Sequence, residues 1–210
     1  MPLHVVDHPL LADILTRLRD RDTPSEEFRA LAYRISVLLV AEATADLPTA
    51  EVAVDTPMEP TVGRRLASRV VAVPVLRAGL GMLQAFLDLI PTAQVGYFGL
   101  ERNEATAIAR CYYEKVPADL HEAVVFLLDP MLATGGSAAM AVDGLRARGA
   151  RGVRFVSIVA APEGVARLAE AAPDAEIYTA ALDRGLDARK YILPGLGDFG
   201  DRLYGTETTT

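Results

Sequence analysis

The sequence has few of the residues that build disulfide frameworks or metal cages. Its 210 residues include one cysteine, three histidines and no tryptophan. The single cysteine, Cys111, excludes an internal disulfide and a cysteine-based zinc site. The histidines, His4, His8 and His121, are scattered and show no metal-ligand spacing. We therefore expect the protein to supply no metal cluster of its own.

Positive charge is also scarce, with 21 lysines and arginines against 28 acidic residues and a net charge of −7. This balance disfavours broad nucleic-acid binding, although it leaves room for a local basic pocket. No apolar run is long enough to span a bilayer. The opening residues, 1–11, lack the layout of a signal peptide. We expect a cytoplasmic protein that acts on small molecules and binds neither nucleic acid nor membrane.

Apolar residues make up 51% of the chain, enough for a sizeable core, and the length suits a single domain over residues 1–210. From residue 69 onward, strand-like and helix-like segments alternate. This alternation predicts an α/β fold with a mainly parallel, twisted sheet flanked by helices. The predicted strands are 69–76, 123–129, 153–160 and 176–182, and the predicted helices between them are 78–90, 137–148 and 163–172.

Two helices are predicted within residues 8–46, where apolar residues recur at helical spacing. Asp7 is the expected N-cap of the first helix. The second has a capping-box pattern, with Thr23 as cap, Pro24 at the first position and Glu26 three residues after the cap.

Two further segments do not fit the strand–helix alternation. Residues 48–64 contain several prolines and are interpreted as a strand with loops. Residues 95–117 are interpreted as a hairpin arm that turns at Asn103–Glu104 and is inserted between a helix and a strand.

A run of five apolar residues, 124–128, ends at Asp129 and leads through Ala133–Ser137 into a helix of small residues. Backbone N–H groups at such a loop and helix start form an anion site, usually a phosphate site. Asp129 stands at the carboxyl end of its strand, where parallel sheets bind ligands. An ordinary strand–turn–helix with two turn glycines explains the loop equally well when it is taken alone.

Two arginines are candidates for binding a second anion. Arg77 follows the strand 69–76 and precedes Gly79 and Gly81, which allow close backbone approach. Arg102 lies near the tip of the hairpin arm, where it can cover an anionic ligand and exclude water. Taken alone, each arginine is better explained as a solvated surface residue, but Arg77 gains weight because it follows the carboxyl end of a strand, as Asp129 does.

The segment 191–201 is rich in glycine. Gly195, Gly197 and Gly200 match the spacing of a dinucleotide fingerprint, but too few residues follow for the helix and strand that such a motif opens. We predict a structured loop around Asp198, whose backbone presents N–H and C=O groups to a flat heterocycle.

Several motifs together closely resemble the bacterial uracil phosphoribosyltransferases, nearly end to end. They are ATADL (43–47), PVLRAGLGM (74–82), RNE (102–104), LLDPMLATGGS (127–137), AAPEG (160–164), YTAALD (178–183) and PGLGDFGDRLYGT (194–206). The most specific is DPMLATGGS, because most other type I phosphoribosyltransferases carry two adjacent acids where this chain has Asp129–Pro130.

The resemblance implies the type I phosphoribosyltransferase fold, with the hairpin arm at about 95–117 and a C-terminal hood at about 179–206. It implies a pentosyltransferase of pyrimidine salvage that converts uracil and phosphoribosyl diphosphate to UMP and diphosphate. It also implies Mg²⁺ bound mainly through the donor, a homodimer or higher homo-oligomer, and GTP as an effector, as in some relatives.

The resemblance assigns roles residue by residue. Asp129 and Asp198 would contact the donor, Arg77 and Arg102 would hold its diphosphate, and these four residues form the expected catalytic set. Phe199 stands where relatives usually carry a small residue, so its ring either packs behind the hood or intrudes on the base. The expected substrate-binding residues are Arg77, Arg102, Asp129, Pro130, Met131, Leu132, Ala133, Thr134, Gly135, Gly136, Ser137, Ile192, Gly197, Asp198 and Phe199.

Two other functions remain open from the sequence. One is a regulator on the same fold that binds uridine nucleotide and RNA, which the acidic balance disfavours. The other is a transferase for a purine or orotate, which Pro130 and the short hood disfavour.

Overall fold

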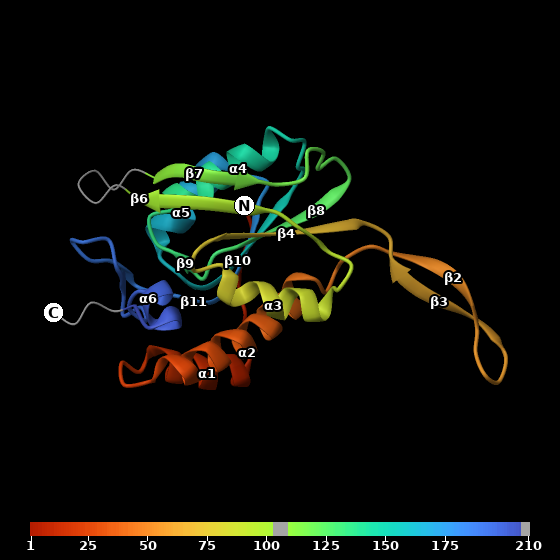
Figure 1. Ribbon diagram of the computed structural model, residues 1–210, viewed down its shortest axis with the longest axis horizontal. Helices are drawn as coiled ribbons and strands as arrows, with labels where there is room; N and C mark the ends of the chain where they lie inside the picture. The colour runs from red at the N-terminus through yellow and green to blue at the C-terminus, as the bar shows by residue number, and fades with distance from the viewer. Residues whose placement is uncertain (103–108, 207–210) are drawn as a thin grey trace.

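The computed structural model of the protein describes residues 1–102 and 109–206 (Figure 1). In this part of the chain, nine strands form one sheet, and every pairing is parallel except that between the last two strands. Two short strands, β5 (Gln94–Val95) and β9 (Met131–Leu132), pair with β4 and β10. The remaining strand order is β1 (Leu3–Val5), β11 (Glu176–Leu182), β10 (Val153–Ala160), β8 (Ala123–Leu128), β4 (Arg69–Leu76), β6 (Tyr97–Arg102) and β7 (Ala109–Lys115).

Helices cover both faces of this sheet (Figure 1). One face carries α1 (Pro9–Arg19), α2 (Ser25–Ala43) and α3 (Leu80–Leu89), and the other carries α4 (Gly136–Arg146) and α5 (Pro162–Ala171). Strand β8 serves both sides, because Phe126 and Leu128 belong to one core cluster while Val125 and Leu127 belong to the other. A strand buried on both faces has no polar alternation, which explains the continuous apolar run. The predicted fold class is confirmed.

The predicted strands and helices of the alternating region are confirmed, with ends that move by at most two residues. The hairpin arm is also present as the antiparallel pair β6–β7. The turn predicted at Asn103–Glu104 lies outside the described residues.

Both predicted N-caps are wrong. The cap of α1 is His8, whose Nδ1 accepts a hydrogen bond from the Leu10 N–H at 3.1 Å, in place of Asp7. The Thr23 hydroxyl donates to the Arg17 carbonyl at 2.7 Å. Because that hydroxyl is engaged with the end of α1, α2 begins without a capping box, and Pro24 occupies the cap position.

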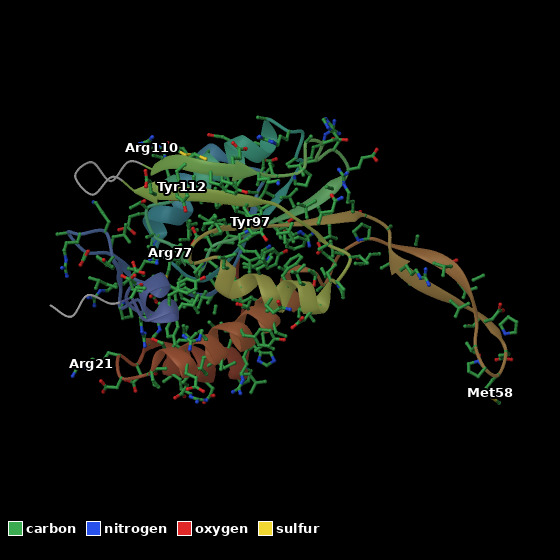
Figure 2. All side chains as sticks on the ribbon, in the orientation of Figure 1. Arg21, Met58, Arg77, Tyr97, Arg110 and Tyr112 are labelled. Atoms are coloured by element: carbon green, nitrogen blue, oxygen red, sulfur yellow. The ribbon has the colours of Figure 1, made fainter. Side chains whose placement is uncertain are left out.

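The prediction of a strand with loops at residues 48–64 is replaced by a two-stranded hairpin. Strands β2 (Thr49–Asp55) and β3 (Pro60–Leu66) pair only with each other. Figure 1 shows this β2–β3 hairpin extending away from the sheet, and Figure 2 places Met58 at its tip, where the residue is 92% exposed.

The C-terminal hood lies at the end of the molecule toward which β4 and β8 run (Figure 1). It contains the two-stranded pair β12 (Gly185–Leu186) and β13 (Ile192–Leu193), followed by α6 (Phe199–Tyr204). The predicted loop around Asp198 therefore ends in a short helix, with Asp198 as its N-cap. None of the helices in the described residues combines the length and the apolar character needed to cross a membrane.

Candidate functional site

A cleft of about 600 Å³ lies between the carboxyl ends of the central strands and the hood. It brings together residues from segments that are far apart in the sequence: the turn after β4, the loop after β8, and the hood. The predicted site residues that line it are Arg77, Asp129, Met131, Leu132, Ala133, Thr134, Gly135, Ser137, Ile192, Gly197, Asp198 and Phe199.

The three remaining residues of the predicted site are Pro130, Gly136 and Arg102. Pro130 is buried, and its carbonyl accepts hydrogen bonds from the backbone of Ile158 and Val159 at 3.0 and 3.1 Å, so it joins the loop to β10. Gly136 is the first residue of α4 and does not border the cleft. The backbone of Arg102 ends β6, but its side chain lies outside the described residues.

The loop from Ala133 to Ser137, called the cradle below, depends on two close backbone approaches. Gly135 has φ +75°, in the left-handed region, and a Cβ there would lie 2.7 Å from the Gly164 carbonyl oxygen. A Cβ on Gly164 would in turn lie 2.5 Å from the Ala133 carbonyl oxygen. Glycine at both positions therefore lets α5 pack directly behind the cradle.

The cradle ends where α4 starts. The first hydrogen bond of the helix runs from the Ala139 N–H to the Gly135 carbonyl at 2.9 Å. The N–H groups before it have no partner within the helix, and they lie at the positive end of the helix dipole. The cradle is thus suited to bind a phosphate group.

Asp129 is half-buried at the carboxyl end of β8. Its backbone N–H donates to the Val156 carbonyl at 3.2 Å, and its Oδ1 accepts from the Met131 N–H at 3.3 Å. The carboxylate is therefore held at the entrance to the cradle, where it can accept hydrogen bonds from hydroxyl groups of a ligand.

Arg77 reaches the cleft from the neighbouring strand β4. A Cβ on Gly79 would lie 2.3 Å from the Leu128 carbonyl oxygen, so the turn after β4 passes tightly over the end of β8. The Arg77 side chain is 58% exposed, and its Nη2 lies 3.3 Å from Asp201 Oδ1. Figure 2 shows Arg77 beside α6. Burial raises the pKa of the nearby Tyr204 hydroxyl, and the positive charge of Arg77 acts in the opposite direction.

Phe199 borders the cleft but is almost completely buried. The residue is 1% exposed, and its ring meets that of Phe28 edge-on, with 5.1 Å between the ring centroids. A Cβ on Gly81 would lie 3.1 Å from Phe199 Cε1, so the ring fills the space between α2 and α3. Of the two interpretations of this residue, the structure has the ring packed behind the hood.

The hood is fixed to the end of α1 by two arginines. Arg19 binds the buried carboxylate of Asp183 with two hydrogen bonds, of 2.6 and 2.9 Å, and it also donates to the Gly195 carbonyl at 2.7 Å. Arg202 is 7% exposed and donates to backbone carbonyls of Leu18 and Leu196, with its guanidinium over the Phe28 ring. The wall of the cleft that the hood forms therefore rests on the first helix.

Sequence reasoning missed three residues that line the cleft from the turn between β12 and β13. They are Arg189, Lys190 and Tyr191. The turn is organised by Asp187, whose Oδ1 accepts hydrogen bonds from the N–H groups of Arg189 and Tyr191 at 2.8 and 2.9 Å. An aspartate two residues before a basic pair is a turn signal that the sequence already contained. With Arg77, Arg189 and Lys190 place three positive charges at the cleft, which the carboxylates of Asp129 and Asp198 also line.

Comparisons with known proteins agree with this geometry. The family model for uracil phosphoribosyltransferase matches residues 5–206. The uracil phosphoribosyltransferase of Pediococcus pentosaceus is 50% identical over 204 residues, which cover 97% of this chain and 98% of that protein. That of Streptococcus salivarius is 49% identical with the same coverage.

Among solved structures, the AQ2163 protein from Aquifex aeolicus superimposes with a TM-score of 0.94 at 36% identity, covering 98% of this chain and 99% of that protein. The match of the family model, the close relatives and the arrangement of cradle and hood have one explanation: this chain belongs to the uracil phosphoribosyltransferase family.

Proposed function

We propose that this protein transfers the phosphoribosyl group of phosphoribosyl diphosphate to uracil, giving UMP and diphosphate. The observation that supports this most strongly is the meeting, in one cleft, of a phosphate cradle with a hood of exposed backbone. The relatives named above carry the same activity in their names. In the reaction, the bond from the ribose C1′ to the diphosphate oxygen breaks and a bond to uracil N1 forms, with loss of the N1 proton.

The donor is assigned to the loop after β8. The cradle would bind the 5′-phosphate through backbone N–H groups at the start of α4. Asp129, held at the cradle entrance, would accept hydrogen bonds from the ribose hydroxyls. This placement leaves C1′ facing the hood, on the side where the base is assigned.

The diphosphate is assigned to Arg77, with Arg102 as a second ligand from the hairpin arm. Displacement at C1′ needs no protein nucleophile. It needs charge stabilisation on the departing diphosphate, together with a positioned base and little competing water. An arginine fork suits a diphosphate because it offers several N–H donors in a fixed geometry.

Uracil is assigned to the hood, at Ile192 and the backbone of Gly197, Asp198 and Phe199. A backbone N–H and C=O pair matches the alternating donor and acceptor groups of uracil. It leaves a polar group unpaired against cytosine, which is a strong basis for discrimination. The inward packing of the Phe199 ring supports this assignment, because a ring packed against Phe28 does not fill the space assigned to the base.

Mg²⁺ is assigned to the donor more than to the protein. In the described residues, no three or more His, Cys, Asp or Glu side chains are grouped to hold a metal ion. Mg²⁺ usually keeps several waters and binds substrate phosphates plus one or two carboxylates. Asp129 and Asp198 both line the cleft and fit that second role. When bound, the ion would neutralise charge on the diphosphate.

We also propose a cytoplasmic homo-oligomer. The donor carries several negative charges, which do not cross a bilayer unaided. The resemblance to the family implies a dimer or a larger assembly, and the exposed β2–β3 hairpin supports it. A GTP effector is likewise proposed from the resemblance.

The direct test measures UMP formation from uracil, phosphoribosyl diphosphate and Mg²⁺, with cytosine, orotate and hypoxanthine in parallel. We expect product from uracil alone. Product from another base would reassign the specificity. If a folded protein bound UMP and structured RNA but made no product, the regulator would be the better explanation.

The site assignment is tested with Asp129→Asn and Arg77→Ala. Both variants should fold normally and lose turnover by about 100-fold or more, the scale seen when one transition-state contact is removed. Arg102→Ala should mainly raise the KM for phosphoribosyl diphosphate. Arg151→Ala, at an exposed position before β10 and away from the cleft, is the control and should behave as wild type. Near-normal turnover of Asp129→Asn or Arg77→Ala would show that the ribose and diphosphate are misplaced.

A further inference from the structure

We propose that Asp201 and Tyr204, on the short helix α6, are positioning residues that set the orientation of Arg77 for diphosphate binding. The inference rests on the proposed function, in which Arg77 binds the diphosphate. Neither residue lines the cleft itself.

Both residues contact Arg77, each at a different part of it. The Asp201 carboxylate forms an ion pair with Arg77 Nη2 at 3.3 Å. The Tyr204 hydroxyl donates to the Arg77 backbone carbonyl at 3.3 Å, and the Tyr204 ring lies 5.7 Å from the guanidinium carbon. Residues three apart share one face of a helix. One face of α6 therefore contacts the backbone carbonyl of Arg77, one terminal nitrogen of its guanidinium and the flat face of that group.

An arginine in this position needs such support. The Arg77 side chain is 58% exposed. A long side chain that is free to rotate loses conformational entropy when a ligand fixes it, so holding it beforehand improves affinity. Asp201 engages one terminal nitrogen of the guanidinium, and the remaining N–H donors stay available for phosphate oxygens.

Asp201 is itself fixed from two sides. Its Oδ1 accepts a hydrogen bond from the Thr206 hydroxyl at 2.7 Å, and its backbone N–H donates to Asp198 Oδ1 at 2.9 Å. Asp198 lines the cleft in the segment assigned to uracil. A continuous set of contacts, from Asp198 through Asp201 to Arg77, thus joins the base half of the site to the diphosphate half.

Substitutions that remove the charge of Asp201 distinguish a positioning role from an electrostatic role. A carboxylate beside Arg77 repels the diphosphate, so removing its charge alone should not weaken donor binding. Removing the hydrogen-bond acceptor should weaken donor binding. Asp201→Asn keeps an acceptor oxygen at the same place, whereas Asp201→Ala removes it.

The experiment measures kcat and the KM for each substrate in Asp201→Ala, Asp201→Asn and Arg77→Ala. We expect Asp201→Ala to raise the KM for phosphoribosyl diphosphate about tenfold, the effect of one lost hydrogen bond to a charged group. The KM for uracil should stay within about twofold, and Asp201→Asn should restore most of the donor affinity. The double variant Arg77→Ala/Asp201→Ala should be no worse than Arg77→Ala alone, because the two residues act as one unit.

A matched control separates positioning from general support of α6. Arg29 on α2 donates to the Leu203 carbonyl of α6 at 2.9 Å and does not contact the cleft. Arg29→Ala should lower the Tm and leave the KM for phosphoribosyl diphosphate unchanged. An equal rise of donor KM in Arg29→Ala and Asp201→Ala would overturn the inference, because any loosening of α6 would then suffice.

Two further outcomes are decisive. If Arg77→Ala raises the donor KM and Asp201→Ala does not, the positioning role is wrong while the site assignment stands. If Arg77→Ala changes neither turnover nor the donor KM, the proposed site fails and the inference fails with it. Should Asp201→Ala not fold, Tyr204→Phe keeps the ring and removes only the bond to the Arg77 carbonyl. An unchanged donor KM in that variant would also overturn the proposal.

Discussion

Phe199 borders the cleft, yet its ring belongs to the hydrophobic core. The ring contacts Phe28 and lies against Gly81, in a region shared by α2, α3 and α6. We therefore expect the size of this side chain to affect core packing more than base selection.

Replacing Phe199 by alanine should consequently destabilise the fold more than it changes the choice of base. Loss of a fully buried phenyl ring lowers the free energy of unfolding by about 3–5 kcal/mol. Urea unfolding followed by circular dichroism measures this loss. Phe199→Leu keeps an apolar side chain there and should leave the KM for uracil within about twofold of wild type. A large rise in uracil KM for Phe199→Leu at unchanged stability would place the ring in the base site.

Single residues also show what the sequence reveals and what it hides. Asp129 and the cradle were identifiable because strand, acid, glycines and helix follow one another within a short segment. Arg189 and Lys190 were missed because their place at the cleft depends on how the hood folds back over the sheet. The partner of Thr23 was missed for the same reason, since the Arg17 carbonyl competes with the capping interaction only once α1 ends nearby.

At the scale of elements, the cradle lies where α4 and α5 pack against each other. Gly135 and Gly164 sit where the two helices approach each other, and each would place a Cβ within 2.7 Å of backbone oxygen. The shape of the cradle therefore depends on helix packing as much as on its own loop.

Gly135→Ala should reduce both stability and donor affinity. Any L residue in the left-handed region costs about 1–2 kcal/mol. Gly152→Ala is a matched control, because Gly152 has φ +69° and an added Cβ there would meet no atom within 4 Å. In urea unfolding, both variants should show a lower free energy of unfolding because of this backbone strain. Only Gly135→Ala should also raise the KM for phosphoribosyl diphosphate. Equal KM values for the two variants would show that the cradle tolerates the displacement of α5.

Elements were predictable where their pattern is internal to the segment. Strands such as Ala123–Leu128 were found because continuous apolar runs mark burial on both faces. The β2–β3 hairpin was not, because a ribbon exposed on both faces has no alternation and its prolines suggested loops. Helix α6 spans six residues, too few for a helical period to be recognised, and β1 has only three.

At the scale of the whole molecule, the β2–β3 hairpin is the feature that the rest of the described chain does not explain. An isolated two-stranded hairpin is at best marginally stable in water. Within the described residues, this one pairs with no other strand and carries exposed apolar side chains at Val54, Met58, Val62 and Leu66. Packing against a second copy would bury these side chains and stabilise the ribbon.

Charged substitutions on the hairpin should therefore lower the oligomer mass. We expect Met58→Asp/Val62→Asp to shift the particle mass toward that of one chain in multi-angle light scattering, with each chain still folded by circular dichroism. Leu89→Asp, an equally charged change at a residue 44% exposed on α3, is the control and should keep the wild-type mass. A mass that falls with Leu89→Asp and not with the hairpin variant would move the interface to the helical face.

The contacts between α1 and the hood can form only after both segments have been synthesised. Arg19 and its partner Gly195 are separated by 176 positions in the chain. At typical synthesis rates of about 5–20 residues per second, a helix made early waits roughly 10–35 s for the segment that completes it. Throughout that interval the growing chain lacks the wall assigned to uracil. Activity should therefore begin only after the hood has been synthesised, and a chain truncated before Gly195 should have none.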